Sequence, residues 1–180
     1  GSEMCIRDSV TGSGETDALE GVYAEIHEDW AWEIALSATG EPGAVKSVIG
    51  STGETSAKGV DASGSKDSNT IEIIASKNIV GSDIGKYKYI LILGSQDGFG
   101  TGKWRDVDAS SKSWRLGGGH DVADDGYNYD SNILDMVLPE GVNQQALLSS
   151  YSVENREYAQ LTGFYIPSVE PVSYTHLTLP

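Results

Sequence analysis

The stretch from residue 120 to residue 130 gathers side chains that could hold a hard cation. Calcium prefers several oxygen ligands carried on a loop, and this stretch is rich in aspartate and glycine. The spacing is not that of an EF-hand, and an aspartate- and glycine-rich loop can equally use these side chains in Asx-turns without any metal. For Asp97 and Asp121 the turn is the favoured interpretation, and for the others both stay open. The candidate calcium ligands are Asp97, Asp121, Asp124, Asp125 and Asp130.

Large aromatic side chains lie in the same long region, from Ser95 to Ser131. Sugar rings have apolar C–H faces that stack on aromatic rings, and their hydroxyls need polar partners, so aromatics on loops indicate binding. For Trp104 and Trp114 the alternative is that the indole closes the end of the fold, and this is favoured for one of the two. The candidates for carbohydrate contact are Phe99, Trp104, Arg105, Trp114 and Tyr127.

Catalytic motifs are not apparent in the sequence. There is no nucleophile elbow and no metalloprotease helix. Glycoside hydrolysis needs a carboxylate pair with one carboxyl in an apolar pocket, and the sequence singles out no such pair. The one cysteine, Cys5, lies near the N-terminus, so the rest of the chain has neither a disulfide framework nor a thiol nucleophile. We therefore expect a protein that is not an enzyme.

Composition limits the class of partner. The chain has 180 residues, which fits one domain. It carries 27 acidic and 12 basic residues, a formal net charge of −15, and so repels the phosphate backbone of nucleic acids. No apolar run is long enough to span a bilayer. Abundant glycine and serine with few lysines favour an extracellular or cell-surface protein.

Both ends of the chain resemble translated transposon-end sequencing adapter. The DNA strings that encode residues 1–9 and 172–180 in this interpretation are reverse complements in their inner parts, which is the arrangement of an adapter flanking an insert. Such segments are excluded from fold reasoning. We expect residues 1–9 and 172–180 to be non-native and residues 10–171 to form a single domain.

The elements that would position these side chains are mostly strands, because apolar residues recur with a period of two between turn signals. Trp30, Trp32, Ile34 and Leu36 predict one buried strand face, and Lys86 to Gly94 predicts a central strand covered on both sides. This pattern predicts an all-β fold, an antiparallel β-sandwich. Further strands are expected at Val45–Ile49, near Ser56–Val60, and at Thr70–Ala75, Asn132–Leu138 and Leu161–Ile166. We also expect either a turn or one turn of helix at Lys77–Ile84, and a short helix at Gln144–Ser150.

Several strings in series resemble the C-terminal module of glucodextranases and amylopullulanases. They are Trp32–Leu36, Leu93–Gly100, Lys103–Arg105, Trp114–Gly119, Asn132–Gly141 and Leu148–Tyr151. The resemblance implies a jelly-roll-like sandwich related to carbohydrate-binding modules, carried by secreted or cell-surface glycoside hydrolases. The family module begins well before the counterpart of Ala18, so the domain is expected to be incomplete at its N-terminal side.

Two functions from different classes follow. The first is a non-catalytic extracellular module, stabilised by calcium, that binds a polysaccharide or cell-wall glycan. The alternative is a calcium-dependent, self-assembling filament or tube subunit. A sandwich that lacks strands exposes backbone edges, and a strand donated by another copy can complete it. Self-association would then occur through the exposed strand edges.

Overall fold

The computed structural model describes residues 2–4, 14–38, 46–50, 55–56, 58–95, 104–119, 123–124 and 127–166. Within these residues strands dominate, which confirms the expected all-β class. The helical elements are short, namely α1 (Lys77–Val80), α2 (Gln144–Leu148) and the 3-10 turns η1 (Glu28–Trp30) and η2 (Ile84–Lys86). No helix in the described part of the chain is long and apolar enough to cross a membrane.

The central sheet has three strands, with β9 (Leu91–Ser95) between β1 (Ser2–Met4) and β14 (Ile133–Val137). Both neighbours run antiparallel to β9. The prediction of a central strand here is therefore confirmed, although Lys86–Gly94 is not continuous. It divides at Ile90 into β8 (Lys88–Tyr89) and β9, which join different sheets.

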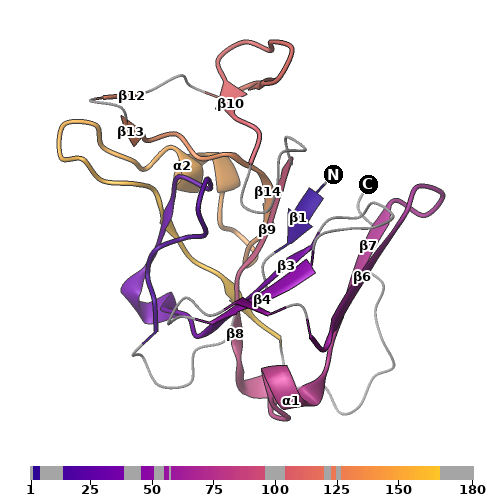
Figure 1. Cartoon of the computed structure of the whole chain (residues 1–180). Helices are drawn as coiled ribbons and strands as arrows, with labels where there is room; N and C mark the ends of the chain where they lie inside the picture. Colours follow the sequence, from indigo (N-terminus) through magenta and orange to yellow (C-terminus); the bar gives the residue numbers. More distant parts are fainter. Residues whose placement is uncertain are drawn as a thin grey trace.

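A second group of strands lies beside this sheet (Figure 1). β3 (Ile34–Ala38), β4 (Lys46–Gly50) and β5 (Thr55–Ser56) form one antiparallel sheet. β6 (Val60–Ser65) and β7 (Thr70–Ala75) form a hairpin that projects from the molecule. β7 has the expected bounds. The prediction of a strand over Ser56–Val60 is wrong, because Ser56 ends β5, Lys58 and Gly59 form a turn, and Val60 begins β6.

The remaining strands are two-residue pairings that tie distant segments together. β2 (Glu25–Ile26) pairs in parallel with β15 (Gln160–Leu161), and β8 pairs antiparallel with β16 (Phe164–Tyr165). The strand predicted over Leu161–Ile166 is thus interrupted. At Gly163, between the two pieces, an added Cβ would lie 1.9 Å from the Tyr89 carbonyl oxygen, so only glycine allows this approach.

The same short pairings occur in the long region expected to be a loop. β10 (Val107–Asp108) pairs in parallel with β11 (Leu116–Gly117). β12 (Ala123–Asp124) pairs antiparallel with β13 (Tyr127–Asn128). These pairings lie in the described part of the region, at the end of the molecule drawn uppermost in Figure 1.

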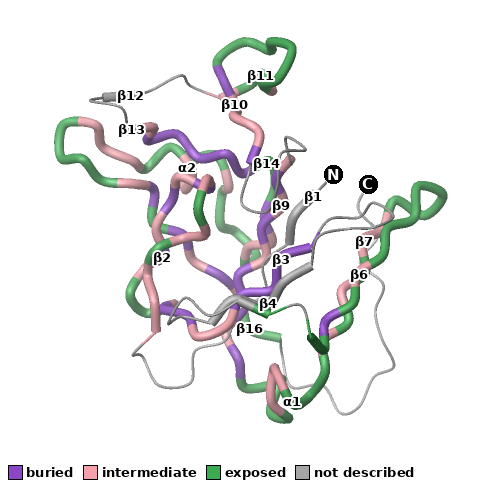
Figure 2. The backbone as a smooth tube through the Cα atoms, in the orientation of Figure 1, coloured by how far each residue is buried: buried purple, intermediate pink, exposed green. Residues whose placement is uncertain are grey.

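The hydrophobic core lies between the central sheet and the segment of residues 14–38, where Figure 2 shows the buried stretches coming together. Trp32 belongs to it, and its indole N–H donates to the Asp17 carbonyl at 2.8 Å. Trp30 does not share a strand face with it, since Trp30 ends η1 and the strand begins only at Ile34. The core consists of Val22, Ala24, Ile26, Trp32, Ala35, Ile90, Ile92, Trp104, Ile133, Met136 and Leu161.

Candidate functional site

Trp114 lies in the loop between β10 and β11, at the uppermost end of the molecule in Figures 1 and 2. Its side chain is 66% exposed, the largest exposed fraction among the large hydrophobic residues of the described segments. Exposing an indole to this extent forgoes the stabilisation that its burial would bring. An aromatic ring held out on a structured loop is typical of a binding contact.

The base of this loop is held by a buried carboxylate. Asp108 is only 3% exposed and accepts hydrogen bonds from Lys112 Nζ at 2.9 Å and from Arg115 Nη1 at 2.9 and 3.1 Å. These hydrogen bonds, from Lys112 first and Arg115 second, lower the pKa of Asp108 below its ordinary 3.8. The charged carboxylate therefore fixes the two residues that flank Ser113 and Trp114.

A second anchor joins the loop to the rest of the fold. Asn132 is 1% exposed, and its side-chain oxygen accepts a hydrogen bond from Val107 N at 3.0 Å. Its side-chain nitrogen donates to the Gly21 carbonyl at 2.8 Å, and its backbone N–H donates to the Val22 carbonyl. The loop is thereby connected to the segment of residues 14–38 and to the start of β14.

The chemistry available here is stacking combined with hydrogen-bond donation. The exposed Trp114 ring can cover the apolar face of a sugar. Lys112 and Arg115 are also exposed and can donate to hydroxyls, and Asp106, 3.6 Å from Arg115 Nε, can accept. Asp108 is buried and neutralised by its partners, so it is not poised as a general acid or base.

The other predicted carbohydrate residues are not brought together with Trp114. Trp104 is 6% exposed and packs in the core over Gly94, where an added Cβ would lie 1.8 Å from the indole ring. Arg105 is half-buried, and its backbone N–H donates to the Ser95 carbonyl at 2.6 Å. Phe99 and the side chain of Tyr127 lie outside the described residues.

Of the predicted calcium ligands, Asp130 is the one whose side chain falls within the described residues. It is buried next to Tyr129, which packs against Tyr158 with ring centroids 5.3 Å apart. Burial of the Tyr151 hydroxyl raises the pKa of Tyr151, and the negative charge of Asp130 raises it further. Asp97, Asp121, Asp125 and the side chain of Asp124 lie outside the described part.

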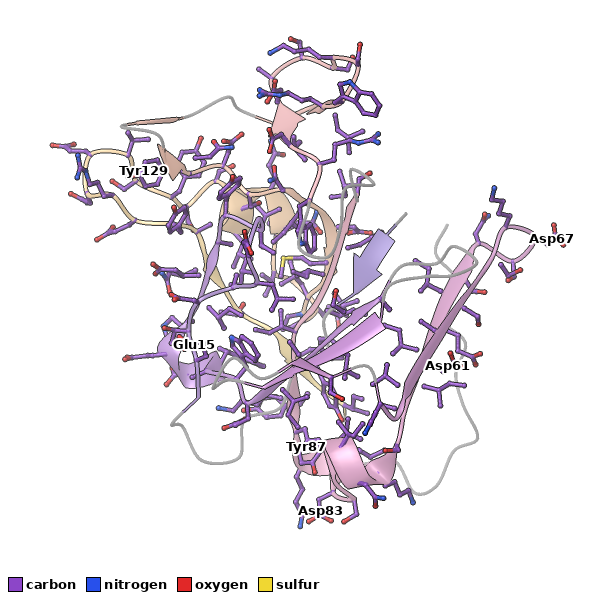
Figure 3. All side chains as sticks on the ribbon, viewed as in Figure 1. Glu15, Asp61, Asp67, Asp83, Tyr87 and Tyr129 are labelled. Atoms are coloured by element: carbon purple, nitrogen blue, oxygen red, sulfur yellow. The ribbon has the colours of Figure 1, made fainter. Side chains whose placement is uncertain are left out.

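Acidic side chains in the described segments are dispersed over the surface. These segments contain no group of three or more His, Cys, Asp or Glu residues placed to hold a metal ion. Figure 3 shows Glu15 and Asp83 on separate parts of the molecule, and Asp61 and Asp67 on the hairpin of β6 and β7. These labelled acidic residues are therefore spread over the molecule, whereas Asp108 and Asp130 are buried.

Sequence reasoning missed the residues that hold the loop. Lys112 follows Asp108 by four residues and carries the opposite charge, which is a local signal that could have indicated the pair. Asn132 gave no such signal, because its partners at Gly21 and Val107 are distant in the sequence. Only the folded chain brings them together.

Comparison with known proteins identifies a family for this chain. The family model for the C-terminal binding-module, SLH-like, of glucodextranase matches residues 3–163. The matched range begins inside the N-terminal segment interpreted as adapter and ends before the C-terminal one. No curated protein matches the chain. Because the match spans most of the sequence, this chain belongs to the family of SLH-like C-terminal binding modules of glucodextranase.

Proposed function

We propose that this chain is an extracellular module that binds a neutral polysaccharide or cell-wall glycan through the Trp114 loop, defined as residues 106–119. Its family membership makes it a non-catalytic carbohydrate- or surface-binding module. The observation that supports this particular site is the exposed Trp114 ring on a loop whose base is fixed by the buried Asp108. A pre-positioned aromatic loses little conformational freedom on binding.

The charge of the molecule favours a neutral ligand. A formal net charge of −15 repels anionic polymers at long range. The two cations nearest Trp114 in the sequence, Lys112 and Arg115, already pair with Asp108, and Arg115 also lies close to Asp106. An uncharged glycan does not compete with these ion pairs.

Trp114→Ala tests the site. We expect the variant to lose affinity for the glycan by a factor of about 10 or more, as for central aromatic contacts in interfaces generally. The measurement is affinity electrophoresis against a panel of α-glucans and wall polysaccharides. Trp114→Phe, which keeps an aromatic face, should retain most of the affinity, and Ile74→Ala, an exposed apolar residue on β7, serves as the matched control. Unchanged retention of Trp114→Ala would refute the proposal.

We further propose that calcium stabilises the module at the aspartate-rich region from residue 120 to residue 130. Support comes from the number of carboxylates in that stretch and from the burial of Asp130 at its end. A cation that binds only the folded state raises the unfolding temperature by mass action. Calcium added to the chelator-treated protein should therefore raise it, and magnesium should do so less. The same unfolding temperature with calcium and with chelator would exclude the site.

Self-assembly is the second candidate function. Its support is that β9 pairs with β1, a three-residue strand at the N-terminal end of the sequence. A sheet edge that accepts a strand so distant in the sequence can also accept a strand from another copy. Light scattering in calcium and then in chelator separates the two candidates. Large calcium-dependent particles without any glycan favour assembly, whereas a monomer in both conditions contradicts it.

A further inference from the structure

A second aromatic surface lies on the ribbon formed by β8 and β16. Their antiparallel register places Tyr165 opposite Lys88 and Phe164 opposite Tyr89. Neighbouring residues of a strand point to opposite faces. Phe164 stacks on the buried Tyr89 with ring centroids 5.9 Å apart, so this pair marks the inner face. Tyr165 and Lys88 therefore lie on the outer face.

Trp30 completes this outer face. Its ring is tilted by 52° to that of Tyr165, with centroids 5.4 Å apart, and Lys88 Nζ lies 5.7 Å from the Trp30 ring centroid. Trp30 also packs against the hydrophobic core, and its backbone N–H donates to the His27 carbonyl at 2.7 Å. The half-buried indole thus fixes the position of the Tyr165 ring, which remains 57% exposed.

Polar groups border the two rings. Lys88 Nζ donates to the Asp29 carbonyl, and an ammonium group has further N–H donors. The Asp29 side chain is exposed and lies 3.5 Å from His27 Nδ1. An exposed aromatic face bordered by one cation and one carboxylate offers a pyranose ring both an apolar contact and partners for its hydroxyls.

We propose that Trp30, Tyr165 and Lys88 form a second carbohydrate contact, here called the Tyr165 surface. A pyranose ring stacks on Tyr165, and its hydroxyls bond to Lys88 and Asp29. The class of ligand rests on the function proposed above, and the position of this contact is independent of it. The mixed charges at the border and the strongly negative chain favour a neutral glycan over an anionic one.

The two contacts lie at opposite ends of the described fold. The Trp114 loop is at the upper end in Figure 1, whereas β8 is at the lower end, where Figure 3 labels Tyr87. A short oligosaccharide cannot reach both. A long glycan, or two separate glycan chains, can occupy both at once, so binding to polymers gains from the high effective concentration of the second contact. When two separate glycan chains occupy the two contacts, the module bridges them.

The test compares Tyr165→Ala, Trp114→Ala and the double variant, with Ile74→Ala as the control. The probe is soluble dextran of high molecular mass, with amylopectin as a second α-glucan. We expect affinity electrophoresis to show retention weakened about tenfold in each single variant and abolished in the double variant. Light scattering should show cross-linked particles with the unmodified protein and with Ile74→Ala, and none with either single variant. Tyr165→Phe, which keeps the ring, should restore both behaviours.

The outcomes separate the two proposals. If Tyr165→Ala matches the unmodified protein in retention and in particle formation, the Tyr165 surface is refuted and the Trp114 loop is unaffected. If Tyr165→Ala weakens retention but Trp114→Ala has no effect, the Tyr165 surface stands and the function proposed for the loop is wrong. If the unmodified protein is not retained by either glucan, the bridging of α-glucans is overturned. Thermal unfolding of each variant checks that the fold is retained.

Discussion

Asp108 illustrates how one carboxylate controls the loop that carries Trp114. Its pKa is lowered by the hydrogen bonds from Lys112 and Arg115, so its stabilising contribution is fully present above the ordinary value of 3.8. That contribution is lost as the pH falls below 3.8 through the lowered pKa of the folded protein. At neutral pH the loop is held at full strength.

We predict that acid loosens the Trp114 loop before it affects the rest of the fold. The protection factor for amide exchange, which is the ratio of the intrinsic to the observed rate, should fall at Leu116 and Gly119 as the pH drops below the ordinary pKa of Asp108, because their N–H groups donate to the Asp106 and Asp108 carbonyls. The Asp108→Asn variant should exchange faster already at neutral pH and should respond less to acid. An identical acid response in the two proteins would contradict this assignment.

Asn132 makes a different kind of contribution, because its partners are backbone groups. Asn132→Ala should lower the free energy of unfolding by about 1–3 kcal/mol, since it leaves the Val107 N–H without its acceptor. Urea denaturation measures the change. Asn143→Ala is a useful comparison, because the Asn143 side chain accepts a hydrogen bond only from Ala146 N, at the exposed start of α2. A loss no larger than that of Asn143→Ala would argue against the anchoring role.

At the scale of the elements, β9 depends on a glycine. Gly94 lies under the Trp104 ring, and its backbone φ is not positive, so the requirement there is for space. Gly94→Ala should lower the free energy of unfolding by about 1–3 kcal/mol through overpacking. Gly85→Ala is the matched control, because nothing lies within 4 Å of an added Cβ at that position. Equal stability of the two variants, measured by thermal unfolding, would contradict the packing described for Trp104.

How much of the fold the sequence predicts depends on how each element is stabilised. β7 and β14 were predicted closely because each is a short run of mostly apolar residues between polar segments. β6 was missed because Val60–Ser65 contains one large apolar residue and is held by backbone pairing to β7. Trp30 was misassigned because its spacing from Trp32 imitates a strand, whereas the chain makes a 3-10 turn there. Likewise, loop aromatics can be recognised in a sequence, but their exposure cannot, as Trp104 and Trp114 demonstrate.

At the scale of the whole molecule, the proposed domain limits can be tested by deletion. The family match ends at residue 163, and we propose that residues 172–180 are foreign to the module. A chain that ends at residue 171 should therefore unfold at the same temperature as the full chain. Deletion of residues 1–9 should lower that temperature, because it removes β1 from the edge of β9. A large loss of stability on removing residues 172–180 would overturn the proposed limit.

The four tryptophans occupy three environments, and this gives the module its own optical reporter. Trp32 and Trp104 are buried, Trp30 is half-buried beneath Lys88, and Trp114 is exposed to solvent. A small neutral quencher such as acrylamide should therefore quench the red-shifted emission of Trp114 at a lower concentration than the emission of the other tryptophans. Protection of this component by a saccharide would identify the occupied end of the molecule without any label.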